Sequence, residues 1–101
     1  MTIGERLREL RVAKGLYQRH IAAALDMDTA YVSKMESNEK PVRREHLPRL
    51  AELLDGSAAE LDQLWLATKL YHLLENEPAA AEALRLAREQ LAQYRTQNDR
   101  S

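Results

Sequence analysis

The fold is decided between residues 18 and 37, where the chain reads QRHIAAALDMDTAYVSKMES. Apolar residues at helical spacing predict a short helix over about residues 17–25. Asp28 is a favourable N-cap residue for a second short helix over about residues 29–37. The small side chain of Ala22 allows the two helices to cross closely. Two short helices joined by a tight turn have the geometry of a helix-turn-helix.

The second of these helices has two different faces. Val32 and Met35 lie about one turn apart and are expected to point into the core. The residues on the other side have short or flexible side chains, which a helix needs in order to enter the major groove of DNA. This outward face consists of Thr29, Ala30, Ser33 and Lys34.

A further helix is expected on the N-terminal side, over about residues 3–14. Thr2, with Glu5 three residues later, is a capping-box pair that begins it, and Gly15 is a suitable stop. The cations of this helix are expected to form a solvated surface balanced by Glu5 and Glu9. These cations are Arg6, Arg8, Arg11 and Lys14.

Three more helices are expected in the C-terminal half. The first carries apolar residues at helical spacing over residues 47–54, with Pro48 in its first turn. After a break at residues 55–56, a densely apolar helix is expected over about residues 58–75. A last helix follows, with Pro78 in its first turn and with apolar residues spaced alternately by four and three, as in a coiled-coil seam. The seam consists of Ala80, Leu84, Ala87, Leu91 and Tyr94.

Composition also favours a small all-α protein. The 101 residues are 45% hydrophobic, with three Gly and three Pro, and they contain no Cys, which excludes disulfides and thiolate metal sites. The charged N-terminus does not resemble a signal peptide, and no stretch approaches the ~20 apolar residues that cross a bilayer, so a cytoplasmic protein without a membrane partner is expected. Residues 1–50 carry a net charge of +3 and residues 51–101 of −4, which suits a DNA-binding first half.

At this point the sequence resembles a known family. The stretches 15–22 (GLYQRHIA) and 31–36 (YVSKME), with the apolar pattern of residues 47–61, resemble the Cro/phage-repressor, or XRE-type, family of helix-turn-helix proteins. The resemblance covers about residues 3–64. It implies a compact lambda-repressor-like domain and a sequence-specific transcriptional regulator that binds double-stranded DNA as a homodimer on a pseudo-palindromic operator. Phage-type repressors, restriction–modification controllers and toxin–antitoxin regulators are alternatives within this family.

The resemblance also implies roles for individual residues. Gln18 corresponds to a glutamine that contacts the phosphate backbone, the outward face of residues 29–34 corresponds to base-edge positions, and Glu36 corresponds to a structural acid. Two positions depart from the family pattern, because Tyr17 replaces the usual Ser or Thr cap and Asp26 replaces the usual Gly of the turn. The implied DNA-binding residues are Gln18, Arg19, Thr29, Ala30, Tyr31, Ser33, Lys34, Ser37, Lys40, Arg43 and Arg44.

The chain is expected to divide into a DNA-binding domain (residues 1–64), a helical dimerisation extension (65–97) and a flexible tail (98–101). The last two helices carry more apolar side chains than one small domain can cover. A homodimer surface is therefore expected there rather than an intramolecular cap. The expected interface residues are Trp65, Leu70, Leu74, Leu84, Leu91 and Tyr94.

Other functional classes receive less support. The sequence shows no nucleophile–base pair, Gly-rich phosphate loop or paired-carboxylate motif, so no enzymatic activity is expected. His20, His46 and His72 lack metal-ligand spacing, and no cofactor, metal or small-molecule ligand is expected. The alternative from another class is a protein-interaction module such as an antitoxin, in which the acidic, Leu-rich C-terminus binds a partner.

Overall fold

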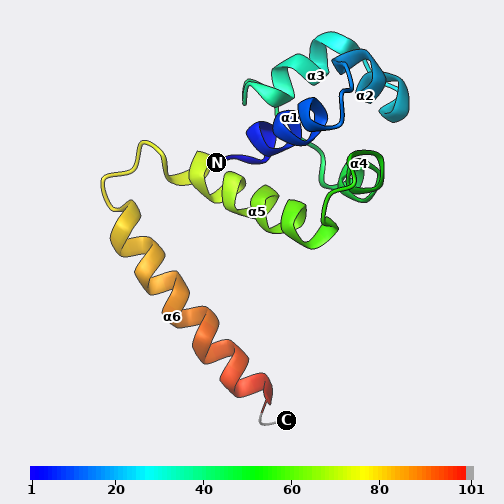
Figure 1. Cartoon of the computed structure of the whole chain (residues 1–101). Coiled ribbons are helices and arrows are strands. Elements are labelled where there is room, and N and C mark those ends of the chain that lie inside the picture. Colours follow the sequence, from blue (N-terminus) through cyan, green and yellow to red (C-terminus); the bar gives the residue numbers. More distant parts are fainter. Residues whose placement is uncertain (100–101) are drawn as a thin grey trace. The chain divides into compact units, whose positions relative to one another are not determined.

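The computed structural model describes the backbone of residues 1–99 and the side chains of residues 1–95. As expected, this part of the chain is all-helical and contains no strand (Figure 1). The α-helices are α1 (Ile3–Ala13), α2 (Gln18–Leu25), α3 (Thr29–Glu36), α4 (Leu47–Leu54), α5 (Ala58–Leu74) and α6 (Ala80–Asp99), and a short 3₁₀ helix, η1 (Arg44–His46), precedes α4.

The chain divides into two compact units. The first unit, Met1–Leu70, contains α1 to α4 and most of α5, and the second unit, Tyr71–Ser101, contains the end of α5 and α6. The first unit thus extends six residues beyond the expected boundary at residue 64. Of the expected tail, residues 98–99 belong to α6, and residues 100–101 lie outside the described residues.

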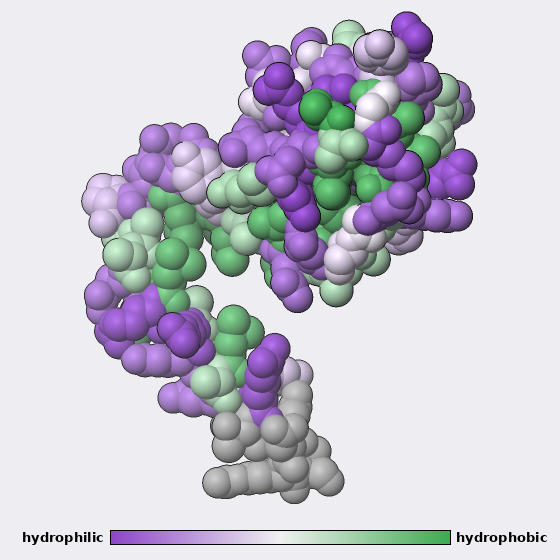
Figure 2. Space-filling model, viewed as in Figure 1, coloured by the Kyte–Doolittle hydropathy of each residue, from purple (hydrophilic) through white to green (hydrophobic). Residues whose placement is uncertain are grey.

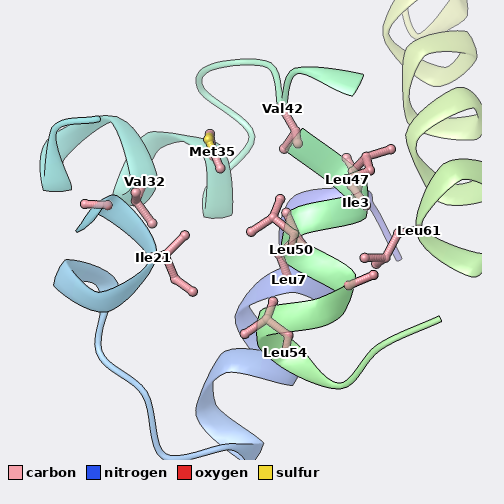
Figure 3. Close-up of a cluster of buried hydrophobic side chains, with 12 residues drawn as sticks. Ile3, Leu7, Ile21, Val32, Met35, Val42, Leu47, Leu50, Leu54 and Leu61 are labelled. Atoms are coloured by element: carbon pink, nitrogen blue, oxygen red, sulfur yellow. The ribbon is translucent and has the colours of Figure 1, made fainter. Parts of the chain in front are cut away.

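One hydrophobic core holds the first unit together (Figure 3). The inward face of α3 is confirmed, since Val32 and Met35 are almost inaccessible to solvent. The apolar stripe of α4 is also buried throughout. The side chains labelled in Figure 3 are Ile3, Leu7, Ile21, Val32, Met35, Val42, Leu47, Leu50, Leu54 and Leu61.

Several helix ends follow the local signals in the sequence. The Thr2 hydroxyl accepts a hydrogen bond from the backbone N–H of Glu5 at 3.3 Å, and Gly15 follows α1 with φ +72°. Asp26 ends α2 in the left-handed conformation that the family pattern assigns to a glycine. Because a φ of 53° is unfavourable for a residue with a Cβ, this turn stores some strain.

At two helix ends the structure differs in detail from the expectation. Asp28 is the N-cap residue of α3, as expected, with extended backbone, but its side chain makes no capping hydrogen bond. Pro78 lies two residues before α6 rather than in its first turn. Both differences concern one or two residues at a helix end and leave the order of helices unchanged.

Helix α5 connects the end of the first unit to its beginning. The buried hydroxyl of Thr68 accepts a hydrogen bond from the backbone N–H of Ile3 at 2.9 Å. This N–H belongs to the first residue of α1 and has no partner within its own helix. Leu61, two turns earlier on the same face of α5, is completely buried. Helix α5 therefore belongs to the packed first unit as far as Leu70.

Within its own unit, α6 is exposed over residues 81–95. Its apolar residues reach the surface between hydrophilic ones, as the green and purple areas of Figure 2 show for the face in view. Within the described residues, no helix is long and apolar enough to cross a membrane.

Candidate nucleic-acid interface

Helices α2 and α3 pack directly against each other and form the expected helix-turn-helix (Figure 1). Ile21 and Ala22 of α2 are buried, and the small side chain of Ala22 is compatible with the close packing of the two helices. All four residues expected at base-edge positions are exposed on α3: Thr29, Ala30, Ser33 and Lys34. The structure therefore brings these four side chains together on the surface of one short helix.

Gln18 is held in place by a buried ion pair. Its Nε2 donates to Glu36 Oε1 at 3.0 Å, and Arg11 approaches the same carboxylate with Nε at 2.7 Å and Nη2 at 2.9 Å. Arg11 Nη1 also donates to the Leu16 carbonyl at 2.9 Å. The network joins α1, α2 and α3, and it fixes the amide of Gln18 at the N-terminus of α2. Glu36 is thus structural, as expected.

The expectation that Arg11 belongs to a solvated surface was wrong. Its side chain is only 11% exposed and that of Glu36 only 5%. Arg6 likewise binds Glu60 of α5 as well as Glu9 of its own helix. The cause lies in the crossing of α1 with α3 and α5, which brings carboxylates from distant parts of the sequence to these cations.

Replacing Arg11 by methionine should lower the free energy of unfolding by about 3 kcal/mol, because it leaves the carboxylate of Glu36 buried without its cation. Arg8→Met is the matched control, since Arg8 is an exposed arginine of the same helix. Adding Glu36→Gln to Arg11→Met should restore part of the loss. Urea unfolding measures the stability of the three variants. Equal stabilities of Arg11→Met and Arg8→Met would contradict a stabilising role of the ion pair between Arg11 and Glu36.

The N-terminus of α2 is capped in a way that sequence reasoning missed. Tyr17 replaces the usual Ser or Thr, but its backbone N–H donates to His20 Nδ1 at 2.8 Å. Only the three-residue spacing of a capping box was visible in the sequence, because Tyr and His are not the residue types of that signature. The guanidinium of Arg19 lies 4.8 Å from the centre of the Tyr17 ring. Arg19 is therefore exposed beside Gln18 with a preferred orientation.

Two hydrogen bonds hold the loop that follows α3 close to this helix. The Tyr31 hydroxyl donates to the Pro41 carbonyl at 2.9 Å, and the Ser37 hydroxyl donates to the Lys34 carbonyl at 3.2 Å. Lys40 is exposed in this loop. Arg43 is also exposed and lies 4.0 Å from a carboxylate oxygen of Glu45.

Arg44, unlike Lys40 and Arg43 of the same loop, is held by two hydrogen bonds to a carboxylate of α5. Its Nε and Nη2 donate to the two carboxylate oxygens of Asp62 at 2.8 and 3.0 Å. These hydrogen bonds raise the pKa of Arg44 and lower the pKa of Asp62 from their usual values. Arg44 is therefore oriented by α5 as well as by its own segment.

Trp65 connects the same loop to α5. Its Nε1 donates to the Val42 carbonyl at 2.6 Å, and its ring packs against the core. Arg44 and Lys69 approach the ring, with Cζ at 4.8 Å and Nζ at 5.0 Å from its centre. Trp65, expected at a dimer interface, is thus engaged within its own chain. Lys69 was not among the expected site residues.

Of the other expected interface residues, two belong to α5 and three to α6. Leu74 is half-buried, and the remaining four are exposed by 44–64%. No partner chain is present, so their role in a dimer stays a prediction. These four are Leu70, Leu84, Leu91 and Tyr94. Nowhere in the described part of the chain do three His, Asp or Glu side chains come together in a possible metal site.

Comparison with known proteins defines the class. Residues 2–64 match the model of the helix-turn-helix domain family, and the chain belongs to this family. A 55-residue segment is 44% identical to the HTH-type transcriptional regulator PrpR of Mycobacterium tuberculosis. That alignment covers 54% of this chain and 11% of PrpR, so the chain corresponds to a small part of that relative. No solved structure matches the chain.

Proposed function

We propose that this protein is a sequence-specific DNA-binding transcriptional regulator in which α3 enters the major groove. One observation carries the proposal: α3 presents four short or flexible side chains to solvent, while its other face is fixed in the core. Membership of the helix-turn-helix family and the similarity to a protein named as a transcriptional regulator support it.

In this proposal the side chains divide into two groups. Gln18, Arg19 and the cations of the loop after α3 contact phosphates and set the position of the domain on the duplex. Lys34 and its neighbours on α3 contact base edges and provide sequence preference. The buried network of Arg11 and Glu36 contributes indirectly, since it keeps the Gln18 amide at the end of α2.

Lys34→Ala should weaken binding to a selected operator by about 1–3 kcal/mol and relax the preference at one base pair in each half-site. Gln18→Ala should weaken binding to all sequences similarly, because a phosphate contact carries no base information. The operator is first obtained by selecting random duplexes with the purified protein. Gel-shift titration at fixed salt then measures both variants, and an unchanged affinity in both would exclude this docking mode.

We also propose that the regulator acts as a homodimer of the XRE type on a pseudo-palindromic operator. The apolar seam of α6 supports this, since Leu84, Leu91 and Tyr94 are exposed at heptad spacing. A two-fold dimer presents identical recognition helices to two inverted half-sites. In this proposal, dimerisation makes operator binding depend on the concentration of the protein.

A second candidate function is a protein-interaction module, such as an antitoxin, that uses the helix-turn-helix as a scaffold. The exposed apolar surface of α6 and the net charge of −1 favour it. Binding to a duplex of random sequence discriminates the two functions. A DNA-binding regulator must show affinity that falls steeply as salt rises, because bound cations release counterions from the duplex. A scaffold shows no such binding.

A further inference from the structure

Two cations share one indole ring where the loop after α3 meets α5. Arg44 Cζ and Lys69 Nζ lie 4.8 and 5.0 Å from the centre of the Trp65 ring. Asp62 neutralises Arg44 through a two-point hydrogen bond. Among the side chains that the structure describes, none forms an ion pair with Lys69. The Trp65 ring thus has two positive charges beside it, of which only that of Arg44 is paired with a carboxylate, and the excess positive charge favours an anion.

Two hydrogen bonds connect this cluster, through the loop after α3, to the recognition helix. Tyr31 of α3 donates to the Pro41 carbonyl, and Trp65 of α5 donates to the carbonyl of the next residue, Val42. The loop is thus bonded to the recognition helix on one side and to α5 on the other. Arg44 of this loop and Lys69 of α5 both lie against the Trp65 ring.

We propose that Lys69, beside Arg44, binds a phosphate of the DNA backbone, so that α5 extends the DNA-binding surface beyond the helix-turn-helix. This inference rests on the proposed function. Asp62 occupies Nε and Nη2 of Arg44, and Nη1 is left to donate to a phosphate oxygen. Lys69 carries a compact ammonium group on a flexible stem, which suits a point contact with phosphate. Both Trp65 and Lys69 lie beyond residue 64, where the match to the helix-turn-helix family ends.

A salt titration of the full chain tests the proposal. The affinity for a labelled duplex of random sequence is measured against salt for the unchanged protein, Lys69→Gln and Lys14→Gln. Lys14, at the end of α1, is the matched control, because it is also an exposed lysine but forms an ion pair with Asp55. Lys69→Gln should reduce the slope of log affinity against log salt by about 0.9, the value for one phosphate contact. Lys14→Gln should leave the slope unchanged.

Further measurements distinguish a failure of this inference from a failure of the proposed function. Trp65 is the only tryptophan, so its fluorescence shows whether Lys69→Gln leaves the cluster folded. If Lys69→Gln has the slope of the unchanged protein while Lys40→Gln, at an exposed cation of the loop after α3, lowers it, the proposed function stands and this inference is wrong. If the unchanged protein shows no salt-dependent binding, the proposed function fails and the inference fails with it.

A double-mutant cycle tests the contribution of Arg44. Asp62→Asn should strengthen binding to the random duplex, because it removes the carboxylate that competes with phosphate for the guanidinium. The gain should disappear when Arg44→Gln is also present. A gain of the same size in both backgrounds would mean that Asp62 acts through its general charge, and Arg44 would then be excluded as a phosphate contact.

Discussion

Gly4→Ala should lower the free energy of unfolding by about 4 kcal/mol, more than overpacking usually costs. A Cβ on Gly4 would lie 2.2 Å from the Met35 carbonyl oxygen and 3.2 Å from that of Glu36. Both atoms belong to the backbone of α3 and cannot rotate away. The variant must therefore separate α1 from α3, which also opens the packing around Ile3 and Leu7. Urea unfolding followed by circular dichroism measures the loss.

Gly15→Ala is the control for this prediction. Gly15 has φ +72°, but a Cβ there meets no atom within 4 Å. Its replacement should cost only the strain of a left-handed residue with a side chain, about 1 kcal/mol. If Gly4→Ala lowers the free energy of unfolding no more than Gly15→Ala does, α1 and α3 do not cross as closely as described.

Inserting about five base pairs between the half-sites of the operator should weaken binding about 10³-fold, towards the non-specific level. A two-fold dimer places its two recognition helices roughly 34 Å apart, so that both enter the same side of the duplex. Half a helical turn of extra DNA moves one half-site to the opposite side. A dimer held by packed helices cannot follow without breaking its interface. Gel-shift titration at fixed salt measures the change.

Leu84→Asp should produce a comparable loss on the unaltered operator, because a monomer contacts only one half-site. Leu86→Asp is the matched control, since both leucines are 46% exposed but Leu86 lies outside the heptad seam of α6. Sedimentation should show a monomer for Leu84→Asp and a dimer for Leu86→Asp. If the lengthened operator binds as well as the original, the protein binds as a monomer or through a flexible connection, and the symmetric operator is wrong.

The sequence by itself determined the helices and their faces. The Thr2–Glu5 pair and Gly15 act within a few residues, so their effect on the ends of α1 could be predicted from local spacing. The inward positions Val32 and Met35 follow from helical periodicity, which is also a local property. The four exposed side chains of α3 were predicted for the same reason, and the family resemblance assigned them to bases.

Only the tertiary structure decided which distant side chains meet. Arg11 and Glu36 are 25 residues apart, and nothing in the periodicity of α1 distinguishes Arg11 from the exposed Arg8. The same holds for Trp65 and Val42, 23 residues apart, and for the place of Lys69 beside the Trp65 ring. These contacts depend on how α1, α3 and α5 cross, and the crossings are set by the packing of the whole core rather than by any short stretch of sequence.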